Sequence, residues 1–259
     1  MATATKTRGL SDEDRAELLA LTKGADSVEL KVTVPISERS HGAAALGVDP
    51  LGAQIRQVFF FDTPELTLNE NGVVVRARRV QRKGDDTVVK LRPVVPDELP
   101  AKLRRSPNFG VEVDAMPGGF VCSGSMKGAL ARPEVRDAVA GKRRVSKLFS
   151  KEQRSLYAAH APEGLELDDL SILGPISVLK LKFSPEGYAR KLVSELWLYP
   201  DNSMILELST KCAPSEAFQI AAETSAFLTQ RGVDLTGEQQ TKTKKALEYF
   251  SGRLLEEDD

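Results

Sequence analysis

The sequence is poor in cysteine: among its 259 residues the only two are Cys122 and Cys212, which lie far apart and lack the spacing of metal ligands. Two such thiols are typical of a reducing compartment and argue against a fold held by disulfides. No apolar stretch approaches the ~20 residues that a membrane-spanning helix needs, and the first residues lack the apolar core of a secretory signal. We therefore expect a cytoplasmic protein without a membrane partner.

An excess of basic charge is also missing. The chain has 36 Lys and Arg residues against 37 Asp and Glu residues, a net charge of −1. A dedicated nucleic-acid binder carries a global basic excess, so we expect no nucleic-acid polymer as partner. There is no Walker, Rossmann or Gly-x-Ser-x-Gly pattern, and neither His41 nor His160 has a neighbouring metal ligand. Any positive potential must therefore be local.

What the sequence does have is a set of segments in which charged residues recur at every second position. Residues 27–34 read Ser-Val-Glu-Leu-Lys-Val-Thr-Val, which places Glu29 and Lys31 on one face of a strand and four aliphatic residues on the other. The same spacing returns downstream in the pairs Arg76 and Arg78, Lys90 and Arg92, Glu112 and Asp114, and Lys180 and Lys182. Several strands therefore each carry one charged face.

Two arrangements account for such strands. The charged faces could point into solvent from a half-buried antiparallel sheet, which would make the chain a β-rich interaction module. Alternatively they line the inside of a closed barrel, which at about eight strands can hold one small ligand. The opposite faces are aliphatic enough to be buried under helices, which favours the barrel. We predict an α+β fold: a mainly antiparallel, closed or nearly closed β-barrel of about eight strands, with a tunnel-like lumen and flanking helices.

The chain is organised most simply as one domain over residues 1–259. We expect a helix within residues 1–24, where Ser11 and Asp14 form a capping box, and two helices packed on the barrel within residues 212–259. Asn71-Gly72 is a good hairpin turn. The other expected segments are a helix or loop over one barrel mouth at 35–52, an excursion between strands at 93–109, helical pieces at 123–141, and strands at about 176–183, 191–199 and 204–210.

These residues resemble a known family. The opening strand with Glu29 and Lys31 is similar to that of the CYTH domain, the domain of the triphosphate tunnel metalloenzymes, which begins Glu-x-Glu-x-Lys. Residues 57–68, Gln-Val-Phe-Phe-Phe-Asp-Thr-Pro-Glu-Leu-Thr-Leu, followed by the Arg76-x-Arg78 strand and by Lys90, resemble the second signature of that family. The resemblance is most specific over residues 27–92.

The resemblance implies a divalent-metal-dependent hydrolase that acts on an inorganic or organic triphosphate inside a cationic tunnel. It implies that Glu29 and Lys31 are catalytic. Mg²⁺ or Mn²⁺ would be held by Glu29, Glu112, Asp114 and Glu207, with Glu195 as a further candidate. The phosphates would be bound by Lys31, Arg76, Arg78, Lys90, Arg92, Lys147, Arg154, Lys180 and Lys182, among which Lys147 and Arg154 would come from a further pair of strands.

Two positions depart from the family pattern. Aligned on Lys31, the first glutamate of the signature falls on Ser27, and the late acidic strand keeps Glu207 but then has Ser209. One metal remains consistent with the carboxylates present, whereas a second metal is in doubt. Two alternatives therefore stay open: a non-catalytic or weakly catalytic binder of polyphosphate or nucleotide, and an adenylyl cyclase of the class IV type. The expected partner is a triphosphate-containing small molecule, and a homodimer is left open.

Overall fold

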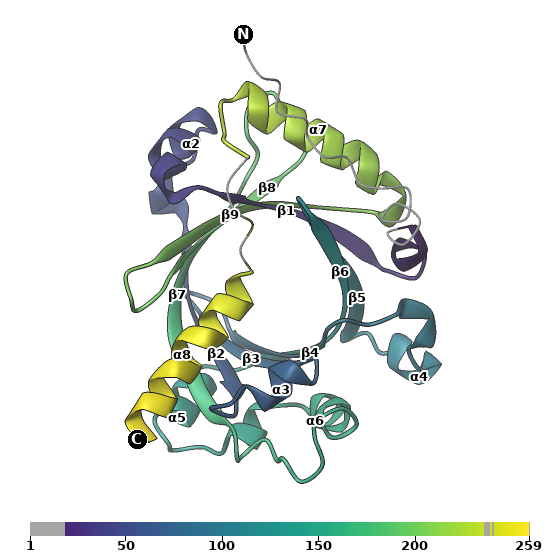
Figure 1. Cartoon of the computed structure of the whole chain (residues 1–259), viewed down its shortest axis with the longest axis vertical. Helices are drawn as coiled ribbons and strands as arrows, with labels where there is room; N and C mark the ends of the chain where they lie inside the picture. Colours follow the sequence, from purple (N-terminus) through teal and green to yellow (C-terminus); the bar gives the residue numbers. More distant parts are fainter. Residues whose placement is uncertain (1–18, 236–238, 240, 259) are drawn as a thin grey trace.

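The barrel is closed, as the strand pattern predicts. The computed structural model describes residues 19–235, 239 and 241–258. Among these residues, nine strands rather than about eight form one ring in the order β1-β5-β6-β4-β3-β2-β7-β8-β9, with β9 returning to β1 (Figure 1). Only β1 and β5 pair in parallel within this described part. The strands are β1 (Ser27–Val34), β2 (Gln54–Asp62), β3 (Val73–Val80), β4 (Asp85–Leu91), β5 (Phe109–Met116), β6 (Gly119–Leu130), β7 (Ser171–Phe183), β8 (Leu192–Leu198) and β9 (Met204–Cys212).

The strand register places the charged faces of neighbouring strands on the same side of the sheet. Between β1 and β9, Lys31 lies opposite Ser209 and Val32 lies opposite Leu208. Residues directly opposite each other share a face of the sheet, so each strand sends its charged side chains to the same side as its neighbour. Val32 and Leu208 are buried on the outer side of the barrel. The charged faces therefore point into the lumen, which excludes the arrangement with solvent-facing charges.

Two groups of helices cover the outer face of the barrel. On one side, α5 (Glu134–Val139), η4 (Val145–Leu148) and α6 (Lys151–Ala158) contribute Val135, Leu148 and Leu156 to a core that includes Phe59 and Phe61 of β2. On the other side, α7 (Ala217–Gln230) and α2 (Arg39–Ala45) flank β1 and β9 (Figure 1). This arrangement buries the aliphatic faces of the strands, which is the main favourable contribution to folding.

Residues 35–52 form helix and loop as expected, namely η1 (Ile36–Glu38), α2 and η2 (Pro50–Gly52). Their position differs from the expected one over a barrel mouth. Leu46 packs with Val34 and Leu208, so the segment lies against the outer face of β1 and β9. The reason is that these outward aliphatic side chains need a cover.

The C-terminal helix, α8 (Lys242–Asp258), lies at a mouth of the barrel, where residues 35–52 were expected. Ala246 and Leu247 are buried against Val58 of β2 and Trp197 of β8, two residues that also line the lumen. In Figure 1, α8 lies across the barrel opening. Of the two C-terminal helices expected from the sequence, α7 covers the outside of the barrel and α8 closes part of one end.

The prediction of helical pieces at 123–141 is wrong for its first half. Residues Gly119–Leu130 form β6, which pairs with β5 on one side and with β4 on the other. Gly124 and Gly128 leave room for close neighbours there, because a Cβ would approach Phe109 Cζ to 2.6 Å and Gln153 Oε1 to 2.5 Å, so these side chains would have to shift. Two ladders of hydrogen bonds and the close approach of neighbouring side chains therefore outweigh the local appearance of the sequence.

The segments that connect the strands agree better with the predictions from the sequence. Residues 93–109 make the expected excursion, with η3 (Pro96–Glu98) and α4 (Ala101–Arg104). Gly72 has φ +71°, as a turn requires, although the link from β2 to β3 also contains α3 (Thr67–Glu70) and is longer than a tight hairpin. A last turn, η5 (Pro214–Glu216), leads into α7. The predicted capping box at Ser11 and Asp14 lies outside the described residues.

Within the described part of the chain, no helix is both long and apolar enough to cross a membrane.

Candidate functional site

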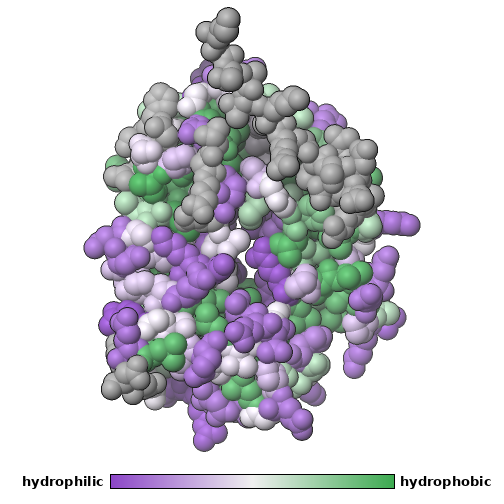
Figure 2. Space-filling model, in the orientation of Figure 1, coloured by the Kyte–Doolittle hydropathy of each residue, from purple (hydrophilic) through white to green (hydrophobic). Residues whose placement is uncertain are grey.

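The inward faces of the strands enclose a cavity of about 670 Å³. Figure 2 shows hydrophilic side chains around a hollow on the face viewed down the barrel. Among the described residues that line it, eleven are basic and five are acidic: Lys31, Arg56, Arg76, Arg78, Lys90, Arg92, Lys127, Lys180, Lys211, Lys242 and Lys244, with Glu29, Glu112, Asp114, Glu195 and Glu207. The lumen therefore has a local positive excess, although the chain as a whole carries a net charge of −1.

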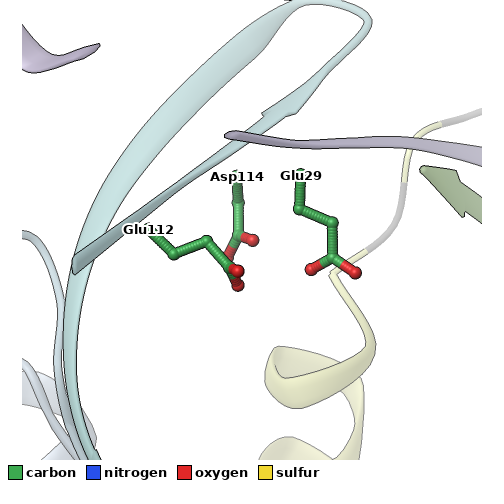
Figure 3. Close-up of side chains that lie close together, drawn as sticks. All are labelled: Glu29, Glu112 and Asp114. Atoms are coloured by element: carbon green, nitrogen blue, oxygen red, sulfur yellow. The ribbon is translucent and has the colours of Figure 1, made fainter. Parts of the chain in front are cut away.

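Three carboxylates converge at one side of this cavity. Glu29 comes from β1, and Glu112 and Asp114 come from β5; the parallel register sets Ser27 opposite Glu112 and Glu29 opposite Asp114. One oxygen atom from each carboxylate lies within 4.8 Å of the others, and Figure 3 shows the three side chains pointing toward one another. An all-oxygen donor set of this kind fits a hard divalent cation such as Mg²⁺ or Mn²⁺. The structure thus brings together three of the four predicted metal ligands.

Lysine side chains balance these carboxylates. Lys31 Nζ lies 3.0 Å from Glu29 Oε2 and 2.8 Å from Asp114 Oδ1, and Lys90 Nζ lies 3.3 Å from Asp114 Oδ2. Lys211 forms an ion pair with Glu112. Burial opposes ionisation of Asp114, whose side chain is only 2% exposed, but Lys31 and Lys90 outweigh it and hold the pKa of its carboxyl far below the ordinary value. The central carboxylate is therefore ionised at neutral pH.

The two serines that depart from the family pattern both donate to this cluster. The Ser27 hydroxyl lies 3.3 Å from Glu112 Oε2, and the Ser209 hydroxyl lies 3.3 Å from Glu29 Oε1. A hydroxyl at these positions orients a carboxylate, whereas a carboxylate there would be a further ligand. The pKa of Glu29 also lies below its ordinary value, because Lys31 outweighs the effect of burial.

Glu207, the fourth predicted metal ligand, faces the same lumen but binds a different group. Its Oε1 atom lies 2.7 Å from Lys242 Nζ, at the start of α8. The same ammonium lies 2.6 Å from Glu195 Oε2, and Lys180 Nζ lies 2.6 Å from Glu195 Oε1. Burial opposes ionisation of Glu195, but Lys242 and Lys180 hold the pKa of its carboxyl far below the ordinary value. Among the described residues, the three-carboxylate group does not include Glu207.

Arginine side chains occupy the wall formed by β2 and β3. Arg56, Arg76 and Arg78 all point into the cavity, and Arg78 Nε donates to Asp86 Oδ1 at 2.8 Å. Arg76 Nε is buried and has no hydrogen-bond partner among the residues that the structure describes. Burial, reinforced by the charge of Arg78, lowers the pKa of Arg76 to about 10. Burial also lowers the pKa of Arg56, again with Arg78 adding to the effect. This wall would be stabilised by an anion.

Two lysines on other strands are also buried with too little negative charge around them. Burial lowers the pKa of Lys90 in spite of Asp114, and burial lowers the pKa of Lys180 in spite of Glu195. Arg92, at the end of β4, completes the group, with one guanidinium nitrogen 3.9 Å from Asp114 Oδ2. All the predicted cations on β1, β3 and β4, together with Lys180 on β7, thus face one cavity.

Three predicted phosphate-binding residues do not line the cavity. Lys182 is exposed near the end of β7. The predicted strand pair for Lys147 and Arg154 is wrong, because Lys147 lies on η4 and Arg154 on α6, both exposed on the outside of the barrel. Ser150 caps α6 through a reciprocal capping box with Gln153, which explains why this segment is helical.

Sequence reasoning missed five cations that line the cavity: Arg56, Lys127, Lys211, Lys242 and Lys244. Arg56, Lys127 and Lys211 each lie two residues from another inward position of the same strand, so strict alternation could have found them. Lys242 begins a helix and carries no such signal. Its contact with Glu195 and Glu207 arises only because α8 packs into the mouth of the barrel.

The comparison with solved structures supports the same fold. A candidate adenylate cyclase from Bacillus halodurans superposes with a TM-score of 0.59 at 13% identity, covering 85% of this chain and 97% of that one. A candidate adenylyl cyclase from Hippeastrum, described as having a dominant triphosphatase activity, superposes with a TM-score of 0.59 at 16% identity, covering 82% of this chain and 91% of that one. No family model and no curated protein matches the sequence. At these identities the match establishes the fold, so this chain has the closed CYTH-like barrel that the resemblance implies.

Proposed function

We propose that this chain binds a triphosphate compound in its cationic tunnel and hydrolyses it with the help of Mg²⁺ or Mn²⁺. The observation that carries the proposal is the juxtaposition, inside one cavity, of three convergent carboxylates with a wall of three arginines, on which the buried Nε atom of Arg76 lacks a hydrogen-bond partner among the described residues. A triphosphate supplies the negative charge that this wall lacks, and a divalent cation suits the carboxylates. The triphosphatase activity attributed to the Hippeastrum protein of the same fold is consistent with it.

The side chains divide the task between binding and positioning. Arg76 and Arg78 would bind phosphate oxygens through their planar guanidinium groups, while Lys90 and Lys180 would add point charges. Glu29, Glu112 and Asp114 would hold the metal ion, which when bound neutralises phosphate charge and polarises a phosphoryl oxygen. Phosphoryl transfer needs little covalent chemistry from the protein, so placement and charge neutralisation supply most of the acceleration.

One observation favours a second function, that of a polyphosphate or nucleotide binder without turnover. The Lys31 ammonium already contacts both Glu29 and Asp114, at 3.0 and 2.8 Å, and so partly satisfies them without a metal. If Lys31 stays in this position, a triphosphate would bind to the cations alone. The two functions differ in whether the metal is needed.

The experiment measures release of inorganic phosphate from inorganic triphosphate and from nucleoside triphosphates, with Mg²⁺, with Mn²⁺ and with a chelator. We expect metal-dependent release that falls by about 100-fold or more in Glu112→Gln, since metal-binding and charge-stabilising groups contribute on that order. Arg136→Ala is the matched surface control, because Arg136 is exposed and pairs only with the neighbouring Asp137 among its described contacts.

Calorimetry separates the two functions. Tight binding of triphosphate with and without metal, together with no release above the Glu112→Gln background, would establish the binder and reject the hydrolase. Binding that requires the metal, together with turnover, would support the hydrolase.

A further inference from the structure

Lys242 is the first residue of α8, and its side-chain ammonium lies between two glutamates of neighbouring strands. Its Nζ atom lies 2.6 Å from Glu195 Oε2 and 2.7 Å from Glu207 Oε1. These glutamates lie directly opposite each other in the pairing of β8 with β9. The side chains of all three residues are 14% exposed or less. The arrangement is therefore a largely buried cation held by two convergent carboxylates.

The remaining side of this ammonium is also occupied. Lys242 Nζ lies 5.1 Å from the centroid of the Trp197 ring, and Trp197 Nε1 donates to Glu195 Oε2 at 3.2 Å. A lysine has three donors. Two of them are used by carboxylates, and the third side faces an aromatic ring, which attracts a cation. Lys242 is thus balanced within the protein, in contrast to Arg76, whose Nε has no partner.

We infer that Lys242 takes the place of a second divalent cation in the tunnel. Its ammonium neutralises Glu195 and Glu207, so the chain holds one Mg²⁺ or Mn²⁺, at Glu29, Glu112 and Asp114. The inference rests on the proposed function for the first cation only. Removal of the Lys242 charge leaves two opposed carboxylates, of which only Glu195 keeps an ion pair within the described part of the chain, with Lys180. Such a pair of oxygen donors would then bind a second hard cation.

The first measurement counts bound Mn²⁺ by calorimetry near neutral pH, without substrate. We expect one Mn²⁺ per chain in the wild type and two in Lys242→Met. Lys242→Arg keeps the charge and should bind one. The double variant Lys242→Met with Glu207→Gln should also return to one. Lys83→Met, which removes the same charge from an exposed turn, controls for the change in net charge.

The second measurement reports where the added ion binds. Trp197 is the only tryptophan in the sequence and lies beside Glu195. Mn²⁺ is paramagnetic and quenches a nearby indole, whereas Mg²⁺ does not. We expect Mn²⁺ to quench Trp197 fluorescence more strongly in Lys242→Met than in the wild type, with no such difference for Mg²⁺. The Tyr199 hydroxyl donates to the backbone oxygen of Lys242, a contact that does not depend on the lysine side chain, so we expect α8 to stay in place in this variant.

The outcomes separate this inference from the proposed function. Two Mn²⁺ ions in the wild type, or equal counts in the wild type and Lys242→Met, would overturn the role of Lys242. No Mn²⁺ in the wild type but one in Lys242→Met would support Lys242 as an internal cation and reject the metal site of the proposed function. Circular dichroism and thermal melting establish that each variant is folded, and a Lys242→Met chain that unfolds is replaced by Lys242→Gln in the same titration.

Discussion

The carboxylate-bearing wall of the tunnel, on β1 and β5, differs from the arginine-bearing wall, on β2 and β3, in how its charges are balanced. On the first wall, Asp114 contacts both Lys31 and Lys90, and Glu112 pairs with Lys211. On the second wall, Arg76 Nε has no hydrogen-bond partner among the described residues, and burial lowers the pKa of Arg76. The charges of the first wall are thus paired within the protein, whereas Arg76 on the second wall is placed to bind an anion.

This difference separates charges that are already balanced within the protein from charges that a bound anion would balance. Removal of a balanced buried charge leaves its partners uncompensated and costs stability. Removal of a buried donor without a partner costs little stability, because no hydrogen bond within the protein is lost. It does remove a contact that a bound ligand would make. Mutations on the two walls should therefore differ in their effect on the stability of the protein without ligand.

The largest effect is expected from Asp114→Asn. The substitution leaves Lys31 and Lys90 in the cavity without their shared carboxylate, so the free energy of unfolding should fall by about 3–5 kcal/mol in urea denaturation. Asp86→Asn, which breaks the more exposed pair with Arg78, should cost under about 1 kcal/mol. Equal losses in the two variants would contradict the distinction between the walls.

Arg76→Met should act in the opposite sense. We expect the affinity for triphosphate to fall by about 100-fold, equivalent to about 2.7 kcal/mol, because a charge-assisted contact is lost. Without ligand, the free energy of unfolding should stay the same or rise, because the buried Nε has no partner to lose. Calorimetry and urea denaturation measure the two quantities. A less stable apoprotein with unchanged affinity would show that Arg76 serves the fold.

The dependence of stability on pH should also distinguish the carboxylate wall. Lys31 and Lys90 hold the pKa of Asp114 far below the ordinary value of 3.8, although burial opposes this. The carboxyl of Asp114 therefore takes up its proton at a higher pH in the unfolded chain than in the native state. The stabilisation is fully present above about pH 5 and is lost progressively as the pH falls further. We expect the free energy of unfolding to decline less steeply below pH 4 in Asp114→Asn than in the wild type. Parallel curves would contradict the pairing.

The smallest effects are expected at Lys147 and Arg154. Both lie on helices outside the barrel, so Lys147→Ala and Arg154→Ala should leave the affinity for triphosphate within about 0.5 kcal/mol of the wild-type value. Lys90→Ala, measured in the same calorimetric series, provides the contrast from inside the cavity. A large loss of affinity at Arg154 would restore the expectation derived from the family resemblance.

Much of the site could be predicted because strand alternation is a local property. The positions of Glu29, Arg76 and Asp114 on charged faces follow from the period of two, and the aliphatic opposite faces favoured a barrel with the charged faces inward. The same reasoning fails where the contact is not local. Residues 123–130 lack a clear strand pattern, yet they complete the ring because β4 and β5 both offer unpaired edges.

Which side chains share a strand face follows from the order of the amino acids alone, because successive residues of an extended chain must point to opposite sides. Three other features arise only in the folded chain: a described ring of nine strands, the approach of Glu29 to Glu112 and Asp114 across a parallel pair, and the contact of Lys242 with Glu195 and Glu207. Those contacts join residues far apart along the chain. Their formation depends on how the barrel and α8 bury apolar surface, which no local pattern encodes.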